Sequence, residues 1–140
     1  MEIVDTVYLV AYFRPSDPLH NQAENIIENL GADRKVSQAA LIELDLLMKT
    51  RRLTLQERIQ VWKILSLFIT PDTVEQLTPL DLAAATYLSH THPIDYFDSL
   101  IAAQCILRAA NPLTTDPAIK ETLRRRKTIQ ENLKKLGIQL

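Results

Sequence analysis

The sequence predicts an α/β sandwich built on a small parallel sheet of four to five strands. Four short apolar segments are too brief to form helices, and each is followed within a few residues by a helix-forming stretch. This alternation is typical of parallel sheets, whose neighbouring strands are joined by helical crossovers. The chain has 140 residues, 46% of them hydrophobic and 24% charged, which fits one globular domain spanning residues 1–140.

Strand and helix signals alternate along the chain. The expected strands are residues 2–4, 35–37, 73–75 and 112–114, with residues 138–140 as a candidate fifth. Asp17-Pro18 predicts a helix start, and Gly31 predicts the left-handed end of that helix. Further helices are expected at residues 7–13, after the second strand, from the capping boxes at residues 54–57 and 78–81, at residues 96–110, and in one long helix from residue 116 through residue 136.

Composition excludes several classes of protein. The formal net charge is −1, so the chain lacks the strongly basic character of proteins held on nucleic acid by overall charge. Only two glycines are present, which excludes every glycine-rich phosphate loop. The single cysteine, Cys105, excludes an internal disulfide and is interpreted as a small core residue. No bilayer-length apolar run and no secretory signal are found, so we expect a cytoplasmic protein without a membrane span.

Two aspartates stand where predicted strands end. Asp5 directly precedes the helix at residues 7–13, and Asp116 directly precedes Pro117. Aspartate at a helix start is a common N-cap, which is a sufficient structural explanation of either residue. The carboxyl ends of parallel strands are also where open α/β sheets bind ligands. Both interpretations stay open at the level of sequence.

Glu43 lies on an apolar face of the helix that follows the second strand. At 100° per residue it shares that face with Ala39 and Leu47. Asp45 falls on the opposite side near Lys49, where an ion pair across one helical turn is a sufficient explanation. Glu43 is therefore a candidate functional acid, and Asp45 is interpreted as solvated.

Asp98 is the clearest candidate. We take Gln104 and Arg108 to mark the wet face of the helix at residues 96–110, and Asp98 lies nearly opposite, in line with Ala102 and Cys105. An inward carboxylate needs a partner such as a metal ion, because burying an unpaired charge costs several kcal/mol. The alternative is a first-turn acid that the helix dipole favours and that still touches water.

Carboxylates that converge on one rim favour a hard divalent cation. Like charges raise one another's pKa, and Mg²⁺ or Mn²⁺ with its preference for oxygen ligands relieves that repulsion. Such ions activate water and neutralise charge in phosphodiester hydrolysis. Residue types and spacing therefore suggest metal-dependent phosphoryl chemistry.

Four motifs together resemble the PIN-domain ribonucleases, and within them the VapC-type toxins of toxin–antitoxin pairs. The motifs run in order over nearly the whole chain: Ile3-Val4-Asp5-Thr6, Leu41-Ile42-Glu43-Leu44, Tyr96-Phe97-Asp98-Ser99-Leu100-Ile101-Ala102-Ala103 and Leu113-Thr114-Thr115-Asp116. The resemblance implies a PIN-like α/β/α sandwich with an acidic metal site at the carboxyl edge of its sheet.

The resemblance also implies roles for residues and partners. Asp5, Glu43, Asp98 and Asp116 would match the family's four acids, which are catalytic and hold Mg²⁺ or Mn²⁺ for cutting single-stranded RNA. Thr6, with Thr114 or Thr115, would supply the hydroxyl groups that the family places near its site. A cognate antitoxin, whose C-terminal segment crosses the active-site groove, is implied as well. Independently of the resemblance, the apolar helices at residues 7–13 and 59–69 predict a partner surface and a homodimer.

One departure from the family pattern concerns the residues after Asp116. Many relatives have a further acid there, whereas this chain has Pro117-Ala118-Ile119. Occupancy by two metal ions is therefore in doubt, although Asp95 is a candidate replacement and equally a candidate N-cap. Basic residues would have to contact the RNA, and among them we favour Arg51 or Arg52 without assigning either to the site.

Two other functions remain open. The missing acid allows a catalytically silent PIN-like module that binds RNA or protein without cutting it. Phosphotransfer at an aspartate would also gather acids at strand ends, but it requires an acid pair after the first strand, and Asp5-Thr6-Val7 supplies none. The nuclease is therefore preferred to both.

Overall fold

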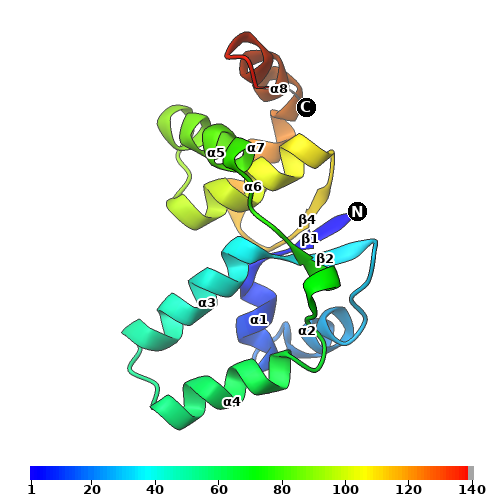
Figure 1. Ribbon diagram of the computed structural model, residues 1–140, viewed down its shortest axis with the longest axis vertical. Coiled ribbons are helices and arrows are strands. Elements are labelled where there is room, and N and C mark those ends of the chain that lie inside the picture. The colour runs from blue at the N-terminus through cyan, green and yellow to red at the C-terminus, as the bar shows by residue number, and fades with distance from the viewer. Residues whose placement is uncertain (139–140) are drawn as a thin grey trace.

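A four-stranded, fully parallel sheet forms the centre of the protein in the computed structural model, which describes residues 1–138. The strand order is β3-β2-β1-β4, and β1 pairs with both β2 and β4. In Figure 1 the helices α1 to α4 lie on one side of the strands and α5 to α8 on the other. This arrangement confirms the predicted α/β sandwich with a small parallel sheet.

The elements follow one another in the predicted alternation. Their bounds are β1 Glu2–Val4, α1 Thr6–Tyr12, α2 His20–Ile27, β2 Arg34–Ser37, α3 Gln38–Thr50, α4 Leu55–Leu65, the 3₁₀ turn η1 Pro71–Thr73, β3 Val74–Glu75, α5 Pro79–Thr91, α6 Tyr96–Arg108, β4 Asn111–Leu113, α7 Pro117–Arg124 and α8 Arg126–Lys135. The capping boxes predicted ahead of α4 and α5 are both formed. None of the helices within residues 1–138 is long and apolar enough to cross a membrane.

The structure corrects two helix boundaries. Helix α2 ends at Ile27 with Glu28 as its C-cap, so Gly31 does not end it and instead pairs with Arg34 in an isolated bridge. The long C-terminal helix is broken at Arg125, between α7 and α8. The guanidinium of Arg126 donates to the carbonyl of Leu123 beside the break. No glycine or proline marks that position, so the sequence does not reveal it. The candidate fifth strand, residues 138–140, lies for the most part outside the described residues.

Helix α6 is buried nearly all round, which corrects the predicted wet face. Every residue from Asp98 to Ile106 is buried, including Gln104. The Gln104 side chain accepts a hydrogen bond from the Ser37 hydroxyl at 2.6 Å and donates to the backbone carbonyls of Glu75 and Gln76. These polar contacts satisfy Gln104 inside the fold and fasten α6 to the ends of β2 and β3.

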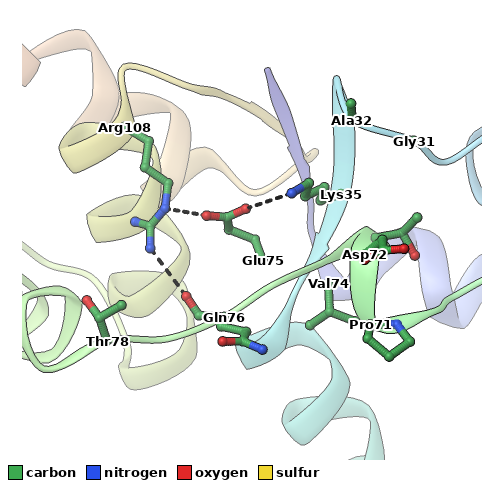
Figure 2. A pocket seen from close by; sticks show the side chains of 11 residues that line it. Gly31, Ala32, Lys35, Pro71, Asp72, Val74, Glu75, Gln76, Thr78 and Arg108 are labelled. Atoms are coloured by element: carbon green, nitrogen blue, oxygen red, sulfur yellow. Dashed lines mark hydrogen bonds and ion pairs between the residues drawn. The ribbon is translucent and has the colours of Figure 1, made fainter.

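Arg108 is also structural rather than solvated. Its guanidinium donates twice to the buried carboxylate of Asp81, at 2.7 and 2.8 Å, and once to Glu75 at 2.5 Å. Figure 2 shows Arg108, Glu75 and Lys35 in a row along a cavity of about 640 Å³. The donors of Arg108 are therefore engaged within the chain beside this cavity at the β3 edge.

The crossover pattern places the site. The chain moves outward from β1 to β2 and β3, then returns to add β4 on the other side of β1. The carboxyl ends of β1 and β4 are therefore the point where strand order reverses, which is where ligands bind in open parallel sheets. Asp5 follows β1 and Asp116 follows β4 across the short Thr114-Thr115 link.

Arg108→Met should lower the free energy of unfolding by about 3–5 kcal/mol, because it leaves the carboxylate of Asp81 buried without its cation. Urea denaturation of purified protein measures this value. Arg124→Met removes an exposed ion pair with Glu121 and should change stability by less than about 1 kcal/mol. Equal effects of the two substitutions would show that Arg108 does not hold β3 and α5 to α6.

Candidate functional site

All four predicted acids line one cleft at the switch point of the sheet. The cleft has a volume of about 450 Å³ and draws its walls from α1, α3, the start of α6 and the link after β4. Its polar lining residues are Asp5, Thr6, Arg14, Asp17, Glu43, Asp95, Asp98, Thr115 and Asp116. The structure therefore brings together the four acids of the sequence prediction, and it adds Asp95, Asp17 and Arg14.

Asp5 is both a helix cap and a wall of the cleft, so the two interpretations of the sequence hold together. Its side chain is only 4% exposed. Oδ1 accepts from the backbone N–H of Thr6, the first residue of α1, and Oδ2 accepts from the Thr114 hydroxyl, each at 2.6 Å. Fixed from both sides, the carboxylate has one orientation relative to β1 and β4.

Asp116 likewise caps a helix, α7, and lines the cleft. Its Oδ1 accepts from the backbone N–H groups of Ala118 and Ile119, at 2.8 and 3.0 Å. Its own N–H donates to the hydroxyl oxygen of Thr114 at 2.9 Å. Thr114 therefore links the two strand-end aspartates, which identifies it, rather than Thr115, as the hydroxyl residue that orients an acid.

Glu43 reaches the cleft from the middle of α3, where it is half-buried. The Thr6 hydroxyl donates to its Oε1, so the residue next to Asp5 also positions the second acid. Asp45 is exposed, as expected, but its partners come from α4: Arg58 at 3.3 Å and the Trp62 indole at 3.2 Å, in place of Lys49. A contact between α3 and α4 takes precedence over the pair within one helix because the two helices fold back on each other.

Asp98 enters the cleft from the first turn of α6 and is 9% exposed. Its backbone N–H donates to Oδ1 of Asp95, the N-cap of α6, at 2.9 Å. Asp95 is thus the predicted cap, and it lines the same cleft as well. The helix start therefore supplies two carboxylates, one nearly buried and one exposed.

Burial and mutual repulsion disfavour ionisation of these acids. The pKa of Asp98 is raised to about 8, first by desolvation and then by the charges of Asp95, Asp116 and Asp5. Burial also raises the pKa of Asp5, with a smaller contribution from Asp116. Burial raises the pKa of Glu43 too, and the surrounding aspartates add to the shift. Asp116 contributes to the raised pKa of each of these three acids, so the protonation of one acid in the cleft affects the others.

The donor set matches a hard divalent cation in chemical type. It consists of carboxylate oxygens with threonine hydroxyls beside them, which are the donors that Mg²⁺ and Mn²⁺ prefer. Within residues 1–138, however, no three His, Cys, Asp or Glu side chains stand close enough together to hold one ion. The role of the four acids as metal ligands therefore stays a prediction. Cys105 is buried, and burial raises the pKa of its thiol to about 12, so it is not a nucleophile for this cleft.

Comparison with known proteins identifies a family and structures with a similar fold. Residues 3–124 match the PIN domain, and no curated protein sequence matches the chain. VapC20 of Mycobacterium tuberculosis, described as a toxin that cleaves the sarcin–ricin loop, is 20% identical over 86% of this chain and 94% of that one, with a TM-score of 0.65. A toxin–antitoxin complex from Klebsiella pneumoniae is 16% identical (83% and 87% covered, TM-score 0.59). VapBC2 of Rickettsia felis, bound to a promoter DNA fragment, is 19% identical (88% and 91%, TM-score 0.62). At these identities the likeness is one of fold.

Raised carboxyl pKa values make stability depend on pH. A folded-state pKa above the unfolded value means that the folded protein binds more protons, so stability is full at low pH and is lost as pH rises through the folded pKa. In EDTA, the free energy of unfolding should fall by at least about 1.4 kcal/mol, the equivalent of one pKa unit, between pH 5 and pH 9. Asp98→Asn should flatten this fall, whereas Asp33→Asn, at an exposed position outside the cleft, should leave it unchanged. Urea denaturation across this pH range measures the difference, and a wild-type profile in Asp98→Asn would show that Asp98 does not carry the effect.

Proposed function

Because the chain belongs to the PIN domain family, we propose that it is an Mg²⁺- or Mn²⁺-dependent endoribonuclease that hydrolyses phosphodiester bonds of single-stranded RNA. The observation that carries the proposal is the cleft lined by Asp5, Glu43, Asp98 and Asp116 at the strand switch point, where burial raises the pKa of the first three. VapC20, which shares the fold, is described as an RNA-loop cleaving toxin.

The proposed ligands are the four predicted acids, directly or through water. A bound divalent ion would supply an activated water and charge neutralisation at the scissile phosphate. Two threonine hydroxyls orient the proposed ligands: Thr114 orients Asp5, and Thr6 orients Glu43. Asp98 holds a proton near neutral pH in the absence of a cation. Asp95, exposed at the edge of the cleft, is the candidate for the acid that the chain lacks after Asp116.

The proposal extends to partners. Structures that share the fold include a toxin–antitoxin complex and VapBC2 on its promoter DNA. We propose that this chain is likewise the toxin of such a pair and that it forms a homodimer. Large apolar side chains exposed on α3 and α4, among them Ile42, Leu46 and Ile59, support a protein partner on that side of the molecule.

A catalytically silent PIN-like module is the second candidate. Two observations favour it: Pro117-Ala118-Ile119 stands where relatives have another acid, and no three acids within residues 1–138 are close enough to hold an ion. Such a module would bind RNA or protein without cutting it, so cleavage of RNA by pure protein separates the two functions.

The nuclease proposal predicts that wild-type protein cuts a mixed RNA pool with Mg²⁺ or Mn²⁺ and that EDTA abolishes the cutting. Asp98→Asn and Asp5→Asn should each reduce the rate at least about a hundredfold, because a metal ligand is lost. The unfolding temperature should be unchanged or raised, because an amide cannot ionise beside the other acids and asparagine at position 5 still caps α1. Gel analysis of labelled RNA measures the rate.

Asp33→Asn is the matched control and should cut like wild type. Cleavage by Asp98→Asn at the wild-type rate would contradict the site assignment. Absence of cleavage by wild type with either metal would instead favour the silent module.

A further inference from the structure

A second, apolar groove adjoins the acidic cleft. The groove has a volume of about 220 Å³ and lies between α1, α3 and the middle of α4. Val10, Arg14 and Leu47 line both the cleft and the groove, so the two share a wall. Its remaining walls are mostly apolar, with Phe13, Leu44 and Met48 among them. A ligand that lies across the carboxylates therefore has a direct path onto this surface.

Two arginines stand along that path. Arg14 follows the last turn of α1, and Arg51 is the C-cap of α3, which packs against α1. Both side chains line the groove, and both residues are exposed. Two cations at adjacent helix C-termini are favoured by the helix dipoles, which explains why they remain there without carboxylate partners.

The guanidinium groups of Arg14 and Arg51 are not engaged by the fold. Most other arginines contact a carboxylate or carbonyl: Arg34, Arg58, Arg108, Arg124, Arg125 and Arg126. Arg14 and Arg51 contact neither among residues 1–138, although Arg14 lines a cleft that contains six carboxylates. The contrast with Arg108, whose donors are used internally, indicates groups that are available to an external anion.

We propose that Arg14 and Arg51 bind the phosphates of single-stranded RNA beside the scissile bond and lead the strand from the acidic cleft along the α1–α3 groove. The proposal rests on the nuclease function proposed above and names the path of its substrate. Guanidinium groups bind phosphate through paired hydrogen bonds, and phosphate contacts dominate affinity for nucleic acid. The groove is smaller than a typical ligand pocket, and its apolar floor has room for a single unstacked base.

The charges that line the cleft and the groove favour an RNA strand over a protein segment as the ligand. A carboxylate-lined cleft repels RNA, so a strand that reaches it needs cations close by, and Arg14 is the cation that lines the cleft itself. The net charge of −1 provides no general attraction for RNA, which leaves local contacts to supply it. A protein segment in the groove would instead be held by the apolar floor, and its affinity would depend little on the two arginines.

Fluorescence anisotropy of a labelled, mixed-sequence single-stranded RNA in EDTA tests the proposal without cleavage. Arg14→Gln and Arg51→Gln should each weaken binding about tenfold and lower the slope of log Kd against log salt by about 0.7. Arg14→Lys should keep the slope, because the charge is retained. Lys134→Gln on the distant helix α8 removes the same charge and should leave both quantities unchanged (Figure 1).

With Mg²⁺, the two glutamine variants should raise KM while kcat changes less, because the contacts are made to substrate and transition state alike. Binding and salt slopes equal to those of Lys134→Gln, or no RNA binding by wild type, would overturn the proposal even if the protein cuts RNA. Arginine-dependent binding without any cleavage would uphold the RNA path and count against the nuclease.

Discussion

Burial of carboxylates at the strand switch point, reinforced by their mutual repulsion, is the constraint that governs the site of this protein. Asp5, Glu43 and Asp98 face a common cleft, and each has a pKa raised by burial and by its acidic neighbours. A fold that only needed to be stable would place apolar residues there, since an uncompensated buried charge costs several kcal/mol. The cost is consistent with a cleft kept for a cation and an anionic substrate, as strained and destabilised sites often serve function.

Local structure explains how the fold tolerates these acids. Asp5, Asp95 and Asp116 each cap a helix, so the carboxylates also satisfy backbone N–H groups that would otherwise lack partners. Threonine hydroxyls engage two of the acids: Thr6 donates to Glu43, and Thr114 donates to Asp5. A helix cap and a cleft-lining acid are therefore not competing explanations here, because the same carboxylate does both.

The sequence predicts the parts that depend on local rules and misses those that depend on tertiary contact. Strand–helix alternation, capping boxes and strand-end aspartates follow from residue types at fixed spacing, and the sheet and the shared cleft confirm them. Gln104 and Arg108 look solvated in sequence because glutamine and arginine usually are, yet Gln104 is fully buried by partners on β2 and β3. Arg14 carries no signal at all, since only the packing of α1 on α3 places it beside the acids. Metal binding by the four acids is established neither by their spacing in the sequence nor by the distances between their side chains in the structure.

If these acids hold a divalent cation, as proposed, its binding must displace the protons that their raised pKa values retain. Calorimetric titration of the purified protein with Mn²⁺ at pH 7, repeated in buffers of different ionisation enthalpy, counts the protons released on binding. Because the pKa of Asp98 is raised to about 8, the account predicts release of about one proton per ion at pH 7 and less at pH 9. Binding without proton release, or no binding at all, would contradict it.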